Sequence, residues 1–157
     1  MPNWCSNVLT ITGDTEVLSK LKPSIDEGRG LLEAVKPLGE WDYNESIEAW
    51  GTKWDIDTEG LQYTDHGDGT STIEGYFESA WSPPVSAFRE LAETCDVELR
   101  YFEPGMCFAG IFSSELGDVW YEDVHELKGL TEEDDPTFND LSEYFDIPSW
   151  YEDEEDV

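Results

Sequence analysis

Apolar residues along the chain follow two periods, and each period predicts a different kind of element. Runs of β-branched residues and of alternating apolar and polar positions predict strands, and turn-forming residues at 65–69 indicate a hairpin. The predicted strands are 3–12, 53–57, 60–64, 70–79, 97–102 and 106–113. Their arrangement along the chain favours antiparallel pairing.

Apolar residues spaced three or four apart predict helices between these strands. Asp14 can cap a helix that continues until Pro23 and Gly28 break the pattern. Further predictions are a short helical turn or packed loop at 30–39, a short helix at 44–50, and a helix opened by Pro83-Pro84. Helices among antiparallel strands predict an α+β fold with the helices packed on one face of the sheet.

The composition indicates a folded chain, because its 157 residues include 7 Trp, 7 Tyr and 7 Phe. No apolar run reaches the roughly 18 residues of a membrane span, and the first residues lack the features of a signal peptide. We therefore expect a cytoplasmic protein with no membrane partner. Cys5, Cys95 and Cys107 form no Cys-x-x-Cys pair, so we interpret them as reduced core residues.

Of all the features of the sequence, the net charge constrains the function most strongly. The chain has 38 Asp and Glu against 8 Lys and Arg, a formal net charge of -30. Residues 115–157 hold 17 of these acids and a single base, Lys128. This change in composition after Ser114 divides the chain into a domain at 1–114 and an acidic extension at 115–157. We expect the extension to pack on the domain or to follow it.

The extension also contains a helical pattern. Asp135-Pro136 suits a helix start, and Phe138, Leu141 and Phe145 then form an apolar stripe. We expect a short acidic helix there, followed by a run of acids at 152–156.

Four motifs, in order along the chain, resemble the YubB-type ferredoxin-like domain of phage and plasmid proteins. They are Pro2-Asn3-Trp4-Cys5-Ser6-Asn7, Trp50-Gly51-Thr52-Lys53-Trp54-Asp55, Ala80-Trp81-Ser82-Pro83-Pro84, and Tyr101-Phe102-Glu103-Pro104-Gly105 with Phe108 and Gly110 beyond it. The resemblance covers about 1–114 and implies a ferredoxin-like antiparallel sheet and a mobile-element origin. If a phage encodes the protein, the expected location is the host cytoplasm. It brings no established reaction. We interpret the motif tryptophans, Trp4, Trp50, Trp54 and Trp81, as core anchors with hydrogen-bonded indoles.

Motifs for catalysis and metal binding are incomplete. The chain lacks a phosphate-binding loop and a nucleophile elbow, and His125-Glu126 lacks a second zinc-binding histidine because that position is Gly129. Asp55-x-Asp57-x-Glu59 resembles the start of a calcium loop, but its twelfth position is His66. We therefore predict a protein that is not an enzyme and that has no metal or cofactor.

The amount of charge suggests a partner. A compact chain of this length is roughly 40 Å across, and duplex DNA presents roughly 23 phosphate charges over that distance. The few basic residues are scattered, so we expect no direct binding to nucleic acid. The leading hypothesis is a DNA mimic, encoded by a phage or plasmid, that occupies the basic groove of a host defence nuclease such as a CRISPR effector or restriction enzyme.

The residues expected to bind this partner lie in the extension. The acids are Glu122, Asp123, Glu126, Glu132, Glu133, Asp134, Asp135, Asp140, Glu143, Asp146, Glu152, Asp153, Glu154, Glu155 and Asp156, and the aromatic anchors are Tyr121, Tyr144, Trp150 and Tyr151. Three alternatives stay open. They are a protein-binding adaptor whose acidic tail contacts a basic partner, a small-molecule site or enzyme around Trp50, Trp54 and Trp81, and a halophilic-type acidic surface without a partner.

Overall fold

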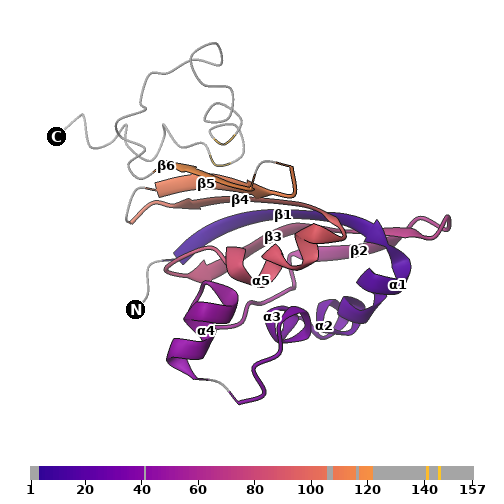
Figure 1. Cartoon of the computed structure of the whole chain (residues 1–157), viewed down its shortest axis with the longest axis horizontal. Helices are drawn as coiled ribbons and strands as arrows, with labels where there is room; N and C mark the ends of the chain where they lie inside the picture. Colours follow the sequence, from indigo (N-terminus) through magenta and orange to yellow (C-terminus); the bar gives the residue numbers. More distant parts are fainter. Residues whose placement is uncertain are drawn as a thin grey trace, which may run out of the picture.

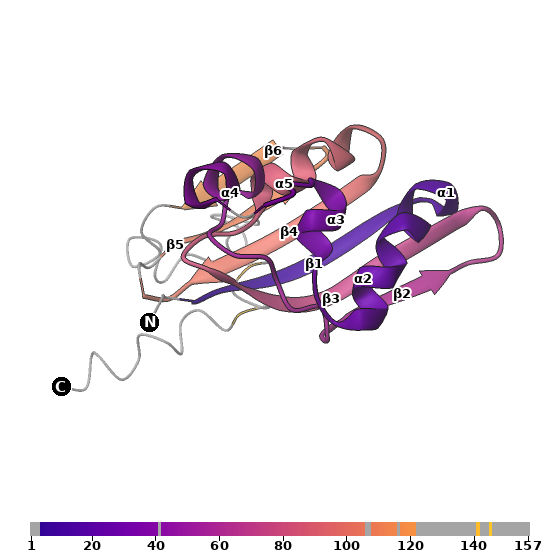
Figure 2. The same ribbon diagram turned by 90° about the horizontal axis from the view of Figure 1, so that it is seen from below.

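The computed structural model describes residues 4–40, 42–105, 108–115 and 117–121, together with Leu141 and Phe145. Within these residues, six strands form one sheet, and the helices cover one of its faces (Figure 1). Seen from below, the helices lie in front of the strands (Figure 2). This is the predicted α+β arrangement.

The strands are β1 (Trp4–Asp14), β2 (Leu61–Asp65), β3 (Thr70–Ala80), β4 (Asp96–Glu103), β5 (Phe108–Ser113) and β6 (Gly117–Tyr121). Their order in the sheet is β2-β3-β1-β4-β5-β6, and all neighbours are antiparallel. Strands β1 to β4, with helices after β1 and β3, make the β-α-β-β-α-β pattern of a ferredoxin-like fold. Strands β5 and β6 extend that sheet beyond β4.

The helical layer consists of short pieces. They are α1 (Thr15–Leu18), α2 (Lys22–Glu27), α3 (Leu31–Val35), α4 (Tyr43–Trp50) and α5 (Val85–Arg89), with 3-10 turns at Ser19–Leu21 and Leu91–Glu93. Pro23 does not end the first helical region as predicted. It lies in the first turn of α2, where a proline loses no hydrogen bond, and Gly28 ends that helix with a φ of 84°.

The core lies between the helices and the sheet. Leu9, Ile11 and Leu99 on the strands are fully buried against Leu18 and Phe88 from the helical layer. Cys5 and Cys95 are buried free thiols, as predicted, whereas Cys107 lies outside the described residues. No helix in the described part of the chain is long and apolar enough to cross a membrane.

Two predictions about the elements were wrong. Residues 53–57 do not form a strand, because Asp55 turns its carboxylate towards α3 and Asp57 makes only an isolated bridge to Arg29. Strand β6 was missed. It lies beyond the predicted boundary at Ser114 and pairs along β5, so the first part of the acidic extension belongs to the sheet.

The extension also contributes apolar contacts to the sheet. Leu141 is fully buried, and the ring of Phe145 lies 6.0 Å from the ring of Phe102 on β4. Both residues belong to the predicted apolar stripe, whose other member, Phe138, lies outside the described residues. The sheet face opposite the helices therefore also has a hydrophobic contact.

Candidate functional site

All four sequence motifs come together at one end of the sheet. Trp4 pairs with Ala80 across β1 and β3, Ser6 pairs with Phe102 across β1 and β4, and Glu103 pairs with Phe108 across β4 and β5. The loop after α4, which carries the second motif, joins the same end through its contacts with β3. Segments distant in sequence thus build one local surface.

Hydrogen bonds fasten the second motif to the third. Thr52 Oγ1 donates to the carbonyl oxygen of Ala80 over 2.8 Å, and Ser82 Oγ donates to the carbonyl oxygen of Gly51 over 2.5 Å. Gly51 has a φ of 85°, and a Cβ there would lie 3.2 Å from the carbonyl oxygen of Pro83. Glycine is therefore favoured by the backbone conformation, and the close approach of the two loops leaves little room for a side chain.

A buried polar group supports these loops from below. Asn7 Nδ2 donates to Ser79 Oγ over 3.0 Å, and Ser79 Oγ donates to the carbonyl oxygen of Ser82 over 2.7 Å. Glu103 is also buried, and its carboxylate accepts the N–H of Gly105 over 2.8 Å. Burial, and then the nearby Glu103 carboxylate, raise the pKa of the Cys5 thiol well above its ordinary value, so Cys5 stays protonated.

The motif tryptophans do not all serve as core anchors. Trp50 does, since it is buried and its indole N–H donates to the carbonyl oxygen of Lys36 over 2.9 Å. For Trp4, Trp54 and Trp81 the prediction was wrong, because their side chains are 42%, 39% and 45% exposed. We call this region, where Trp4, Tyr43, Trp54 and Trp81 are exposed, the aromatic end.

Trp81 stands in an unusual conformation. Its φ is 71°, in a region that bulky residues rarely occupy because the Cβ crowds the backbone. The surrounding bonds hold it there, since Ser82 N–H donates to the carbonyl oxygen of Ala80 over 2.9 Å while Thr52 binds the same oxygen. Backbone strain of this kind is found most often at binding and active sites.

One cation already binds the aromatic end. The ammonium of Lys53 lies 4.5 Å from the centre of the Trp54 ring and 5.9 Å from that of Tyr43. The Trp54 ring in turn lies 6.5 Å from the ring of Trp4, tilted by 44°. The rings therefore form a connected aromatic surface that holds a positive charge over its π-face.

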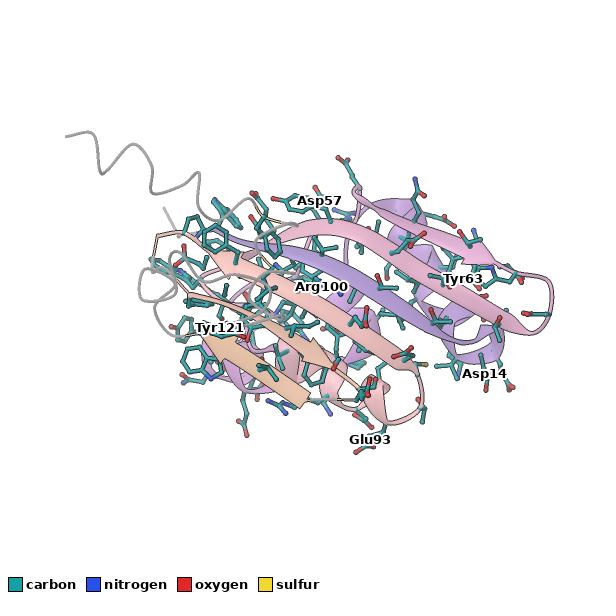
Figure 3. The ribbon with its side chains drawn as sticks, turned by 90° about the horizontal axis from the view of Figure 1, so that it is seen from above. Asp14, Asp57, Tyr63, Glu93, Arg100 and Tyr121 are labelled. Carbon is teal, nitrogen blue, oxygen red and sulfur yellow. The ribbon has the colours of Figure 1, made fainter. Side chains whose placement is uncertain are left out.

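A groove of about 450 Å³ lies beside Trp4, between the loop that leads into β2 and the exposed residues of β3. Trp4 and Tyr76 supply aromatic walls, and Asp57, Glu59 and Glu78 supply exposed carboxylates. Figure 3 shows Asp57 at the edge of the sheet. We call this the Trp4 groove.

The carboxylates of the incomplete calcium loop have separate roles. Asp55 accepts the N–H groups of Leu32 and Glu33 over 2.8 and 3.0 Å, so it caps the start of α3. Asp57 accepts the N–H of Glu59 over 2.8 Å. His66, at the twelfth position, lies in the exposed turn between β2 and β3, as predicted.

Of the predicted partner-binding residues, Tyr121 alone falls in the described part of the chain. It is the last residue of β6, pairs with Ala109 and is half-buried. The other predicted residues lie outside the described residues: Glu122, Asp123, Glu126, Glu132, Glu133, Asp134, Asp135, Asp140, Glu143, Tyr144, Asp146, Trp150, Tyr151, Glu152, Asp153, Glu154, Glu155 and Asp156.

A comparison with known families decides the relationship of the chain. Residues 49–141 match the family described as the ferredoxin-like domain in Api92-like protein. The chain belongs to this family. The match to the Api92-like family includes three of the four motifs and continues past Ser114 to Leu141, so β6 and part of the acidic extension fall within the family domain. No curated protein and no solved structure matches the chain.

Proposed function

We propose that the protein is a non-enzymatic inhibitor, encoded by a phage or plasmid, that imitates DNA. In this proposal it occupies the basic nucleic-acid groove of a host defence nuclease, such as a CRISPR effector or a restriction enzyme. The observation that carries the proposal is an acidic surface whose charge the chain itself does not compensate.

The described residues already contain 23 acids against 7 bases. Nineteen of these acids are exposed. Among the described residues, ion pairs join Lys22 to Asp26 (2.7 Å), Lys36 to Glu90 (2.9 Å) and Arg100 to Glu98 (3.4 Å). Most of the exposed carboxylates therefore face water without a cation beside them.

Such a surface favours a basic partner for two reasons. The repulsion between its carboxylates falls when a partner supplies positive charges, and the opposite fields of the two proteins speed their encounter. An acidic surface releases its associated cations when a basic groove neutralises it, as DNA does when a protein binds it. The proposed contact surface is the acidic part of the extension, with Tyr121, Tyr144, Trp150 and Tyr151 as anchors.

The test is competition with DNA. A fluorescent duplex is bound to a restriction enzyme or a CRISPR effector, and its displacement by the full chain is measured at about 50 and about 200 mM salt. We expect displacement at the lower salt and at least about a tenfold weaker effect at the higher salt. Absence of displacement from every nuclease at low salt, or displacement insensitive to salt, would overturn the proposal.

Matched charge variants locate the effect. The first variant carries Glu132→Gln, Glu133→Gln, Asp134→Asn and Asp135→Asn, and we expect it to lose most of the displacement. The second carries Glu16→Gln, Glu27→Gln, Glu45→Gln and Glu48→Gln, which removes equal charge from exposed positions on the helical side. Equal loss in both variants would assign the effect to net charge rather than to the extension. Truncation after Ser114 is unsuitable, because it removes β6 and the buried Leu141.

The exposed rings of the aromatic end favour a second candidate, a protein-binding adaptor of a mobile element. Aromatic side chains are enriched in protein interfaces and depleted from ordinary surface. An adaptor would bind its partner through these rings and leave the partner's DNA binding intact. A complex that still binds DNA, and that Trp54→Ala weakens, would select this candidate over the inhibitor.

A further inference from the structure

We propose that the Trp4 groove is an arginine-binding site that accepts one guanidinium side chain from the surface of a basic protein. The inference rests on the proposed function only in taking the partner to be basic. It assigns a defined contact to a part of the molecule distant in sequence from the acidic extension.

The wall of the groove is held firmly against the sheet. The carbonyl oxygen of Gly60 accepts the N–H of Tyr76 over 3.1 Å, just before β2 begins. A Cβ on Gly60 would clash with the backbone of Tyr76, so only glycine allows this approach. The loop bearing Asp57 and Glu59 therefore has a fixed position next to the exposed face of β3.

The groove presents two kinds of surface that suit a guanidinium. Trp4 is 42% exposed and Tyr76 is 46% exposed, so both rings are available to stack on a planar cation. Asp57, Glu59 and Glu78 supply carboxylate oxygens along the same groove. A guanidinium can stack on a ring and donate hydrogen bonds to carboxylates at once, which an ammonium does less well.

These carboxylates keep capacity to accept further hydrogen bonds. The Tyr76 hydroxyl donates to one oxygen of Glu78 over 3.1 Å, and the N–H of Glu59 donates to one oxygen of Asp57 over 2.8 Å. The second oxygen of each carboxylate has no hydrogen bond to a described residue. Among the described residues, none of the three acids forms an ion pair with a basic side chain.

The neighbouring ring of Trp54 already binds a cation from within the chain, by a cation–π contact with Lys53. Lys53 lies over Trp54 at 4.5 Å, whereas Trp4, whose ring lies 6.5 Å from that of Trp54, has no cation over it among the described residues. The face of Trp54 is therefore already covered by the ammonium of Lys53. The ring of Trp4, with the three carboxylates beside it, is available to a cation from a partner protein. The described residues include no group of three or more His, Cys, Asp or Glu side chains placed to hold a metal ion.

The probe is the peptide acetyl-Arg-Arg-Arg-amide, titrated into the full chain labelled with 15N at tryptophan. Each of the 7 tryptophans gives an indole N–H signal. We expect the Trp4 signal to shift to saturation while that of Trp120, an exposed ring outside the groove, does not move. The neutral isostere acetyl-Cit-Cit-Cit-amide, where Cit is citrulline, should cause no shift, and the lysine peptide should bind at least about threefold more weakly.

Variants separate the groove from the overall charge. Asp57→Asn with Glu59→Gln should weaken binding of the arginine peptide at least about fivefold, because two of the three carboxylates in the groove lose their charge. Glu16→Gln with Glu48→Gln removes the same charge elsewhere and should change affinity less than about twofold. Any of four results would overturn the assignment. They are an equal loss of affinity in both double variants, signal shifts with the citrulline peptide equal to those with the arginine peptide, equal affinity for the lysine and arginine peptides, and a Trp4 signal that does not move.

The outcomes of the two proposals are distinguishable. Binding of the arginine peptide at Trp4 without any displacement of DNA from a nuclease would refute the proposed function and leave the groove intact. Displacement of DNA by a chain whose Trp4 signal ignores the peptide would refute the groove alone.

Discussion

The hydroxyl of Thr52 donates a hydrogen bond to the carbonyl oxygen of Ala80 over 2.8 Å, and both residues are buried. This bond joins the loop after α4 to the end of β3. The bond also holds Ala80, the residue before Trp81, in place. The position of the exposed Trp81 indole therefore depends on the buried hydroxyl of Thr52.

Replacing Thr52 with valine tests this dependence. Valine has the same shape but no donor, so the carbonyl oxygen of Ala80 would be left buried without this bond, and the free energy of unfolding should fall by about 1–3 kcal/mol. Urea denaturation measures the change. Thr64→Val on the exposed side of β2 is the control and should stay within about 0.5 kcal/mol of the original chain. Similar values for the two variants would show that the bond contributes little.

The conformation of Trp81 predicts an unusual response to glycine. Because its φ of 71° is strained for any residue with a Cβ, Trp81→Gly relieves that strain and should leave the free energy of unfolding unchanged or about 1 kcal/mol higher. Trp120→Gly removes a ring of similar exposure from β6 and should be destabilising, since glycine weakens a strand. A clear loss of stability in Trp81→Gly would mean that the indole contributes packing rather than a displayed surface.

Asp55 provides a test of helix capping across the chain. Its carboxylate accepts the N–H groups of Leu32 and Glu33 at the start of α3, so Asp55→Ala should lower the free energy of unfolding by about 1–2 kcal/mol. Asp55→Asn keeps one acceptor oxygen and should cost less. Thermal denaturation in the presence and absence of calcium measures both variants. A loss of stability that appears only when calcium is present would point to metal binding instead of capping.

The sequence predicts best where one period dominates a long segment. Strands β1, β3 and β4 alternate between the core and the opposite face, so their residues could be placed by pattern alone. Segment 53–57 has the same apparent alternation, but the carboxylate of Asp55 accepts the N–H groups of Leu32 and Glu33 in α3, which are 22 residues away or more in the sequence. No local pattern contains this information.

The aromatic end was predictable only in part. The motifs identified the residues, and the pairing of β1 with β3 and β4 explains why they meet. Exposure of Trp4, Trp54 and Trp81 could not be read from the sequence, because an indole has the same apolar character on either side of a strand or loop. Strand β6 was hidden by the neighbouring acids, although Val119, Trp120 and Tyr121 are typical strand residues.

The buried position of Leu141 predicts that the acidic extension stabilises the domain. Leu141→Ala should lower the free energy of unfolding by about 2–5 kcal/mol, as expected for a fully buried leucine. Phe145→Ala should also be destabilising, since it removes the ring contact with Phe102. Chemical denaturation followed by tryptophan fluorescence reports the change. Ile47→Ala, at a side chain that is 40% exposed, is the control. An effect of Leu141→Ala no larger than that of Ile47→Ala would contradict the prediction.

Two buried groups predict how stability depends on pH. Burial raises the pKa of Tyr101, as does its hydrogen bond to Asp118 over 2.5 Å, and burial also raises the pKa of Cys5. Both groups stay protonated in the folded chain. In the unfolded chain the Cys5 thiol ionises near pH 9 and the Tyr101 hydroxyl near pH 10. Since the unfolded state then binds fewer protons, their contribution is complete below about pH 9 and decreases above it, by about 1.4 kcal/mol per pH unit for each ionised group.

Urea denaturation between about pH 7 and pH 11 measures this slope. Tyr101→Phe and Cys5→Ala together should flatten it, even if they lower stability at neutral pH, because neither replacement can ionise in the unfolded chain. Tyr43→Phe, at an exposed ring, is the matched control and should keep the slope of the original chain. The slope of the free energy of unfolding against pH is the decisive quantity. A loss of packing lowers the free energy of unfolding equally at every pH, whereas a difference in bound protons between the folded and unfolded states changes the slope. An unchanged slope in the double variant would show that other groups cause the alkaline loss of stability.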